Sequence, residues 1–280
     1  MILKRCGLIA PACRSTTRPS RLRGSAFYAA QLRDRAVRMA SQVLDVLLPP
    51  SCMLCGGAVS EYAAGLCAHC RERLEPVDGP VCSRCGAVFS SPCGGDHLCG
   101  TCIVRPPQYD RARSAGVYAG ELRRAIHEFK FNRRSMLAGP LAEFTSRVCR
   151  SIKARCGYAA LVPVPLHPQR LRDRGYNQSL LLALHLGRLW DIAVERDYLR
   201  RDAWSVPQAS LNRAQRPRAV RGAFSCRDRR YAGRRLLLID DVFTSGSTVD
   251  ECARTLKRYG AAAVDVVTVA RTLKDHPECQ

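Results

Sequence analysis

One stretch constrains the fold of this chain more than any other, because it joins an apolar run, two acids and a small hydroxylated loop: LLLIDDVFTSGST, residues 236–248. Residues 236–239 form the apolar run that a strand buried on both faces needs, so Asp240 and Asp241 are expected at its carboxyl end. Open α/β sheets bind their ligands at that edge. The stretch therefore predicts a ligand site at the end of a buried strand.

The residues that follow the two acids are suited to an anion. Their hydroxyls and backbone N–H groups stand where a helix is expected to begin, and the first turn of a helix favours negative charge. These loop residues are Thr244, Ser245, Gly246, Ser247 and Thr248. Gly260 is expected to end the helix, and residues 264–269 are predicted to return as a strand. The unit is therefore βαβ, and it predicts a sugar-phosphate site.

Two other kinds of site carry acids at a strand end, a Walker B-like strand and the acidic pair of a response-regulator-like sheet. Neither explains the hydroxylated loop, and no G-x-x-x-x-G-K-[ST] motif occurs in the chain. The combination instead resembles the 5-phosphoribosyl-1-pyrophosphate (PRPP) loop of type I phosphoribosyltransferases. The resemblance implies that Asp240 and Asp241 are the catalytic residues and hold the ribose 2′ and 3′ hydroxyls, while residues 244–248 wrap the 5′-phosphate. Carboxylates only accept hydrogen bonds and N–H groups only donate them, which agrees with this division.

Eight of the sixteen cysteines form four C-x-x-C pairs between residues 52 and 102. Four pairs supply two sets of four thiolates, as two structural, tetrahedral zinc sites require. The expected Zn²⁺ ligands are Cys52, Cys55, Cys67, Cys70, Cys82, Cys85, Cys99 and Cys102. An internal repeat supports this, since C-x-x-C-G at 52 recurs at 82 and L-C-x-x-C at 66 recurs at 98. Disulfides within the pairs are the alternative. His69, Cys93 and His97 lie between the ligands and are expected to be loop residues, with substitution for one of the ligands as the alternative.

A further string of motifs lies between the cysteine pairs and the end of the chain. It contains V-P-V-P-L from residue 162, R-x-x-x-R-G-Y-N-Q from residue 170 and Q-x-S-L-x-R-x-x-R from residue 208. With the cysteine pairs before it, this order of motifs resembles the ComF (ComFC/GntX-like) family of double-zinc-ribbon, phosphoribosyltransferase-like proteins over about residues 45–272.

The ComF resemblance implies roles for further residues. The turn after Val164 takes the pyrophosphate-loop position, and its candidates are Leu166, His167, Arg170 and Arg174. A mobile loop that closes over PRPP would contain Arg213, Arg216 and Arg218. Solvated arginines are the alternative for each, and Mg²⁺ is expected to accompany PRPP. Lys130, one of five lysines, is expected to end a helix, where it either meets a phosphate or is an ordinary helix-end lysine.

One part of the type I pattern is missing from the sequence. Only residues 271–280 follow the last predicted strand, so a hood for a nitrogenous acceptor is not evident. The acceptor site is expected to come from the zinc module, from residues 103–135, or to be absent. The sequence does not identify the acceptor.

The net charge of +21 is carried unevenly. Residues 200–235 contain eleven basic and two acidic residues, whereas residues 52–102 contain three basic and five acidic ones. A basic surface attracts polyanions, and PRPP, pyrophosphate and nucleic acid all qualify. The alternative explanation of the high arginine content is a GC-rich genome, which encodes arginine at positions where any solvated cation would suffice.

The first residues are a separate question. Residues 1–33 contain seven basic residues and no acid, a composition that imitates a transit peptide. We expect a disordered basic extension or an overlong start, with a short helix around residues 31–48. No apolar run approaches the length of a membrane span, so a soluble, cytoplasmic protein is expected, with an organelle address as the alternative.

Together these features predict an α/β protein. A type I phosphoribosyltransferase-like parallel sheet flanked by helices is expected in residues 107–280, a small double zinc ribbon in 46–106, and the basic extension with its short helix in 1–45. Two functions from different classes are consistent with the sequence. One is a protein of nucleotide metabolism that binds PRPP or a ribose 5-phosphate group with Mg²⁺, either as a binder alone or as an enzyme that transfers phosphoribosyl to an unidentified acceptor. The other is an accessory protein of DNA uptake that contacts single-stranded DNA and a helicase partner.

Overall fold

The computed structural model of the protein describes residues 51–59, 65–89, 94–153, 157–202 and 222–273. These residues all lie in the second of two compact units of the chain, Pro50–Gln280. Four of the features predicted above fall outside the described residues: the helix around 31–48, Cys93, the mobile-loop arginines Arg213, Arg216 and Arg218, and the composition of the first 33 residues.

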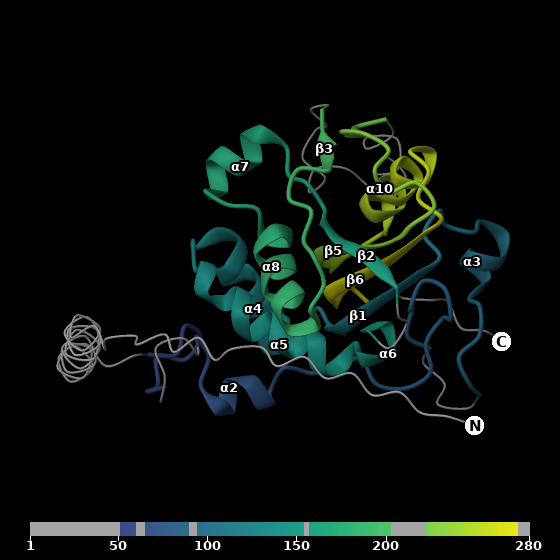
Figure 1. Ribbon diagram of the computed structural model, residues 1–280. Helices are drawn as coiled ribbons and strands as arrows, with labels where there is room; N and C mark the ends of the chain where they lie inside the picture. The colour runs from purple at the N-terminus through teal and green to yellow at the C-terminus, as the bar shows by residue number, and fades with distance from the viewer. Residues whose placement is uncertain (1–50, 60–64, 90–93, 154–156, 203–221, 274–280) are drawn as a thin grey trace, which may run out of the picture. The chain divides into compact units, whose positions relative to one another are not determined.

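A four-stranded parallel sheet forms the centre of the described unit (Figure 1). Its strands, in spatial order, are β1 (Arg111–Val117), β6 (Ala263–Arg271), β5 (Arg235–Phe243) and β2 (Tyr158–Pro163). The middle strands β5 and β6 are buried along most of their length, and most of their residues are apolar, as parallel strands need when helices cover both of their faces. The predicted βαβ unit is present as β5, α10 (Ser247–Arg258) and β6.

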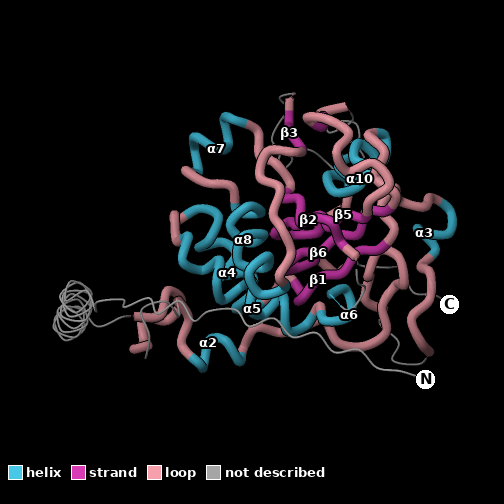
Figure 2. The backbone as a smooth tube through the Cα atoms, in the orientation of Figure 1, coloured by secondary structure: helices cyan, strands magenta, loops and turns pink. Residues whose placement is uncertain are grey.

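Helices cover both faces of the sheet (Figure 2). On one face, α4 (Gly120–Phe131), α5 (Ala138–Val148) and α8 (Gln178–Trp190) pack on side chains that include Leu237 and Val267. On the other face, α10 packs on Leu236 and Val266. The parallel sheet with flanking helices that the sequence predicts is thus confirmed.

Shorter elements complete the described part of the chain. The short helices are α2 (Ala68–Glu72), α3 (Gly100–Val104), η2 (Ser135–Leu137), α6 (Arg150–Lys153) and α7 (Pro168–Arg174). Strands β3 (Leu199–Arg201) and β4 (Phe224–Cys226) form a separate antiparallel pair. No helix in these ranges is both long enough and apolar enough to cross a membrane.

The two cysteine clusters pack against opposite faces of the sheet. Cys52 and Cys70 belong to the core on the α4 and α5 side, whereas Cys82 and Cys102 belong to the core on the α10 side. The segment between the clusters passes along the edge strand β1, where Val77 N–H donates to the Ala115 carbonyl at 2.8 Å. This contact covers a sheet edge that would otherwise expose unpaired backbone groups.

Two elements differ from the sequence prediction. Strand β5 does not end at Ile239 but continues to Phe243, because it stays paired with β6 as far as Arg271. The proline-bounded turn after Val164 contains a short helix, α7, with Pro168 in its first turn and the left-handed Gly175 (φ 81°) at its end. Proline at a helix start and glycine just past its end suit the local backbone.

Candidate functional site

A cavity of about 220 Å³ opens at the carboxyl edge of the sheet. The end of β5, the start of α10, the turn after β2 and helix α7 all contribute to its walls. Most of the residues that the sequence singled out as a sugar-phosphate site meet here. Those that line the cavity are Asp240, Asp241, Thr244, Gly246, Thr248, Leu166, Arg170 and Arg174.

The two acids have different partners. Asp240 Oδ1 accepts from Ser179 Oγ at 2.8 Å and from the backbone N–H of Asp241 at 2.9 Å. Asp241 Oδ1 lies 2.9 Å from Nζ of Lys130, which projects from the end of α4. Burial, and after it the negative charge of Asp241, raises the pKa of Asp240 to about 7. Lys130 therefore neutralises Asp241, whereas Asp240 binds a proton more tightly than an ordinary aspartate does.

The loop after the acids is held closely against β5. Gly246 has φ +79°, a conformation that side-chain-bearing residues rarely adopt. A Cβ at this position would lie 2.5 Å from Cζ of Phe243, whose ring is packed by Tyr109 and by the guanidinium of Arg271. Helix α10 starts at Ser247, so the loop ends on the N-terminal turn of a twelve-residue helix. Such a turn favours a bound anion.

Arginines form the facing wall of the cavity. Arg170 and Arg174 come from α7, and Arg201 comes from β3. Burial, and after it the positive charge of Arg174, lowers the pKa of Arg170. Burial and then the charge of Arg170 lower the pKa of Arg201. Like charges held this close favour a multiply charged anion between them.

Helix α8 fixes this wall to the acid pair. Its first residue follows Asn177, whose Oδ1 accepts from the N–H groups of Ser179 and Leu180. Asn177 Nδ2 also donates to the Val164 carbonyl at 3.1 Å, in the turn after β2. Asn177 thus joins the turn to the helix whose Ser179 bonds Asp240, and the cap explains why the sequence places asparagine here.

Some predicted residues lie elsewhere. Ser245 and Ser247 hydrogen bond to each other and border a second cavity, of about 260 Å³, between the loop and the second cysteine cluster. His167 does not line either of these cavities, because its Nδ1 accepts from Gln169 N–H and caps α7. Partial desolvation, and after it the charges of Arg201, Arg172 and Arg170, lowers the pKa of His167.

The cavity also contains residues that sequence reasoning did not find. These are Tyr118, Ser179 and Arg201. Tyr118 follows β1, and Arg201 belongs to a three-residue strand, so neither stands in a motif that points to a ligand. Ser179 follows the R-G-Y-N-Q string directly, and its place after a capping asparagine was a usable signal.

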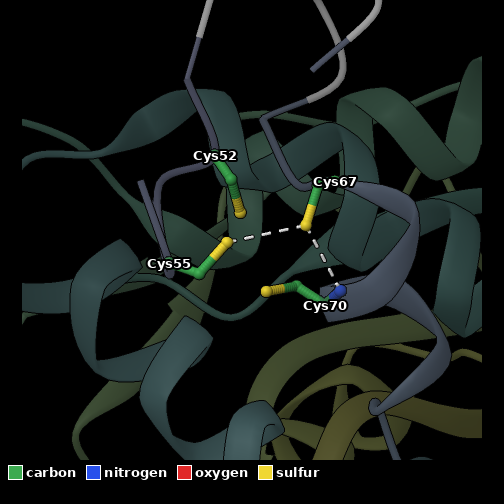
Figure 3. Close-up of side chains that lie close together, drawn as sticks. All are labelled: Cys52, Cys55, Cys67 and Cys70. Carbon is green, nitrogen blue, oxygen red and sulfur yellow. Dashed lines mark hydrogen bonds between the residues drawn. The ribbon is translucent and has the colours of Figure 1, made fainter. Parts of the chain in front are cut away.

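The eight predicted zinc ligands form two groups of four. Within each group, the sulfur atoms of Cys52, Cys55, Cys67 and Cys70, or of Cys82, Cys85, Cys99 and Cys102, lie within 4.8 Å of one another. Figure 3 shows the first group, in which the Cys55 and Cys67 sulfurs are 3.6 Å apart. In the second group the Cys85 and Cys99 sulfurs are 3.8 Å apart. Four thiolates at about 2.3 Å from one zinc ion are separated by about 3.8 Å, which matches.

Backbone donors favour the thiolate form in both groups. Cys70 N–H points to Cys67 Sγ at 3.4 Å, and Cys99 N–H points to Cys82 Sγ at 3.3 Å. Thiolate is the form that binds a metal, whereas a disulfide needs sulfurs about 2.05 Å apart. The two groups are consistent with two closed, four-cysteine zinc sites.

Comparison with known proteins agrees with both halves of this architecture. Residues 43–103 match the double zinc ribbon domain family, and residues 182–280 match the phosphoribosyl transferase domain family. The DNA utilization protein YhgH of Escherichia coli (strain K12) is 34% identical over 230 residues, which cover 81% of this chain and 99% of that protein.

Two further relatives are named as competence proteins. Competence protein F of Haemophilus influenzae is 30% identical over 225 residues, which cover 79% of this chain and 96% of that protein. Competence protein ComFC of Bacillus subtilis is 26% identical over 211 residues, which cover 74% of this chain and 84% of that protein. The chain belongs to the ComF family. Its similarity to these ComF proteins extends across the cysteine clusters and the sheet together.

Proposed function

We propose that this ComF protein binds PRPP, or another ligand with a ribose 5-phosphate group, together with Mg²⁺, and transfers the phosphoribosyl group to an acceptor in nucleotide metabolism. The observation that supports this most is the lining of one cavity by an acid pair, a glycine-containing loop at a helix start, and arginines on the facing wall. The proposal treats residues 46–106 as the zinc module and residues 107–280 as the domain that binds the ligand.

Each wall has a chemical task in this proposal. Asp240 and Asp241 accept hydrogen bonds from the ribose hydroxyls, and residues 244–248 donate to the 5′-phosphate. Arg170, Arg174 and Arg201 neutralise the pyrophosphate. When the C1–O bond to pyrophosphate breaks, its electron pair leaves with the pyrophosphate, and a lone pair of the acceptor forms the new bond to C1. The arginines stabilise the charge that develops on the leaving group.

Mg²⁺ suits this cavity because its acid pair offers hard oxygen donors. When bound, the ion would neutralise oxygens of the ribose and the pyrophosphate, with Asp240 and Asp241 as the protein groups that hold it. Zinc has a separate, structural task, since four cysteines leave no open coordination position. Cysteines kept for metal rather than disulfides fit a reducing compartment, so we place the protein in the cytoplasm.

Charge-removing variants test the proposal. Asp240→Asn and Asp241→Asn keep the shape of the side chain, and each should weaken Mg²⁺-dependent PRPP binding by roughly 1.5–3 kcal/mol for a lost charge-assisted hydrogen bond. Asp78→Asn, an exposed change in the segment between the cysteine clusters, is the control and should bind like wild type. Calorimetric titration measures all three. Equal affinity in the four proteins would contradict the assigned role of the acid pair.

A second candidate function is an accessory role in DNA uptake, in which the protein contacts single-stranded DNA and a helicase partner. The relatives named for DNA utilization and for competence favour it. The basic residues of the chain are compatible with it as well. The two functions do not exclude each other, because the cavity and a nucleic-acid surface need not coincide.

A further inference from the structure

Two aromatic rings stand exposed on the outer side of helix α4. Phe131, the last residue of the helix, is 58% exposed, and among the described residues it is the one aromatic side chain with such a large exposed apolar surface. His127, one turn earlier and also exposed, contacts it with ring centroids 4.8 Å apart. Ile126 and Phe129 of the same helix are fully buried, so the rings of His127 and Phe131 are not part of the core.

A cation covers part of the exposed ring. The guanidinium of Arg174, at the end of α7, lies 5.2 Å from the centroid of Phe131. Arg174 also lines the cavity, and so does Lys130, the neighbour of Phe131 in the chain. Phe131 therefore lies beside two residues of the cavity wall, where a side chain of α7 contacts the end of α4. Figure 1 shows the backbone of these two helices on the same side of the sheet.

The end of α4 and helix α7, together called the rim, are also basic. Residues 127–134 and 168–174 contain Arg133, Arg134, Arg170, Arg172 and Arg174, against the acids Glu128 and Asp173. Glu128 is already paired with Arg134 at 3.2 Å, and Arg172 is exposed to solvent. An exposed aromatic ring among arginines is what proteins use to bind single-stranded nucleic acid, since bases stack on the ring while cations meet the phosphates.

We propose that the rim formed by the end of α4 and by α7 binds single-stranded nucleic acid, with a base stacked on Phe131 and a phosphate at Arg172. This inference rests on the second candidate function and gives it a location. A duplex keeps its base faces stacked and covered, so it cannot use the ring. The zinc module, with more acidic than basic residues in 52–102, is the less suitable surface.

An oligothymidine and an abasic oligonucleotide of the same length separate stacking from charge, because both carry the same phosphates. Fluorescence anisotropy of labelled strands measures binding to the full chain. Wild type should prefer the oligothymidine. Phe131→Ala should weaken oligothymidine binding by about tenfold, the effect of one lost stacking contact, and leave abasic binding unchanged. Leu189→Ala, which truncates a 45% exposed side chain of α8, is the matched control and should bind like wild type.

The charge of the rim is tested separately. Arg172→Gln should weaken the binding of both oligonucleotides equally. It should also reduce the slope of log affinity against log salt concentration by about one, because one fewer counter-ion is released on binding. Arg150→Gln, an exposed arginine of α6, is its control. Thermal melting curves establish that every variant is folded.

The possible failures are distinguishable. Wild type that binds neither strand would overturn the second candidate function and this inference with it. If wild type and Phe131→Ala prefer the oligothymidine to the same extent, the protein binds single strands but not at Phe131. That result would overturn only the proposed location of the binding site. If Phe131→Ala leaves DNA binding intact but loses a protein partner, the rim is a protein-binding surface and the inference is wrong. PRPP titration of Phe131→Ala should match wild type, because Phe131 does not line the cavity.

Discussion

Nζ of Lys130 lies 2.9 Å from Oδ1 of Asp241, and both side chains line the same cavity. Their side chains are 17% and 12% exposed, so water screens the pair only partly. The lysine at the end of α4 thereby supplies a counter-ion for an acid at the end of β5, two elements far apart in the sequence. One of the two acids therefore has a lysine as its counter-ion.

Loss of this counter-ion should destabilise the protein. Lys130→Met leaves a mostly buried carboxylate without its cation, and we expect the free energy of unfolding at pH 7 to fall by about 2 kcal/mol. The double variant with Asp241→Asn should lose less than the sum of the two single variants, since it removes both charges. Urea denaturation measures these values. Lys153→Met, at an exposed helix position, should change stability by less than about 0.5 kcal/mol.

The stability of the protein should depend on pH through Asp240. Its pKa is about 7 in the folded protein, against about 3.9 for an aspartate in an unfolded chain. Between these values the folded state holds a proton that the unfolded state has released. The part of the stability that Asp240 contributes should therefore decline as pH rises from about 4 to about 7, and stay level above that.

Asp240→Asn isolates this dependence, because it cannot titrate and can still accept from Ser179 through its amide oxygen. The free energy of unfolding of wild type minus that of Asp240→Asn should fall as the pH increases across this window. A difference that is flat, or that rises with pH, would show that Asp240 is ionised throughout.

Two zinc ions per chain are expected in the purified protein, one for each group of four cysteines. Elemental analysis counts them. Chelation should lower the melting temperature, because each cluster is part of one of the two cores that flank the sheet. Cys85→Ser should reduce the count to one. Protein without zinc, with its eight thiols oxidised in pairs, would contradict the assignment.

Gly116 should tolerate no side chain. A Cβ there would lie 2.4 Å from Cδ2 of Leu122 and 2.5 Å from the Glu75 carbonyl, in the segment that joins the two cysteine clusters. Gly116→Ala should therefore cost about 1–3 kcal/mol through overpacking where this segment contacts β1. Gly95→Ala, with no atom within 4 Å of the added Cβ, is the control and should be neutral. Thermal unfolding of both variants provides the test.

Local patterns in the sequence were sufficient to predict the central unit. The apolar run at 236–239, the helix after the hydroxylated loop and the returning strand are each indicated by a few neighbouring residues, and they appear as β5, α10 and β6. The cysteine spacing likewise predicted the two groups of four. The continuation of β5 to Phe243 was not predictable, because it depends on pairing with β6.

The sequence predicted the site residues that stand in a motif. It did not predict those that reach the cavity only through tertiary packing. Asp240 and Gly246 stand in a motif, whereas Arg201 reaches the cavity only because β3 pairs with β4 beside it. The sequence predicted that Lys130 either contacts a phosphate or is an ordinary helix-end lysine. In the structure it forms an ion pair with Asp241, which neither alternative included. His167 was predicted in the pyrophosphate loop, and the structure adds that its side chain caps α7.

The central claim is that the cavity binds a ribose 5-phosphate group, and Gly246 tests it most directly. Calorimetric titration of ribose 5-phosphate, and of PRPP with Mg²⁺, should give saturable binding to wild type. Gly246→Ala should bind neither ligand, since its Cβ would displace Phe243 and the loop. Gly79→Ala bears the same left-handed strain (φ +88°) with open space around it, and should bind both. If wild type binds neither ligand at millimolar concentrations with Mg²⁺ present, the claim is wrong.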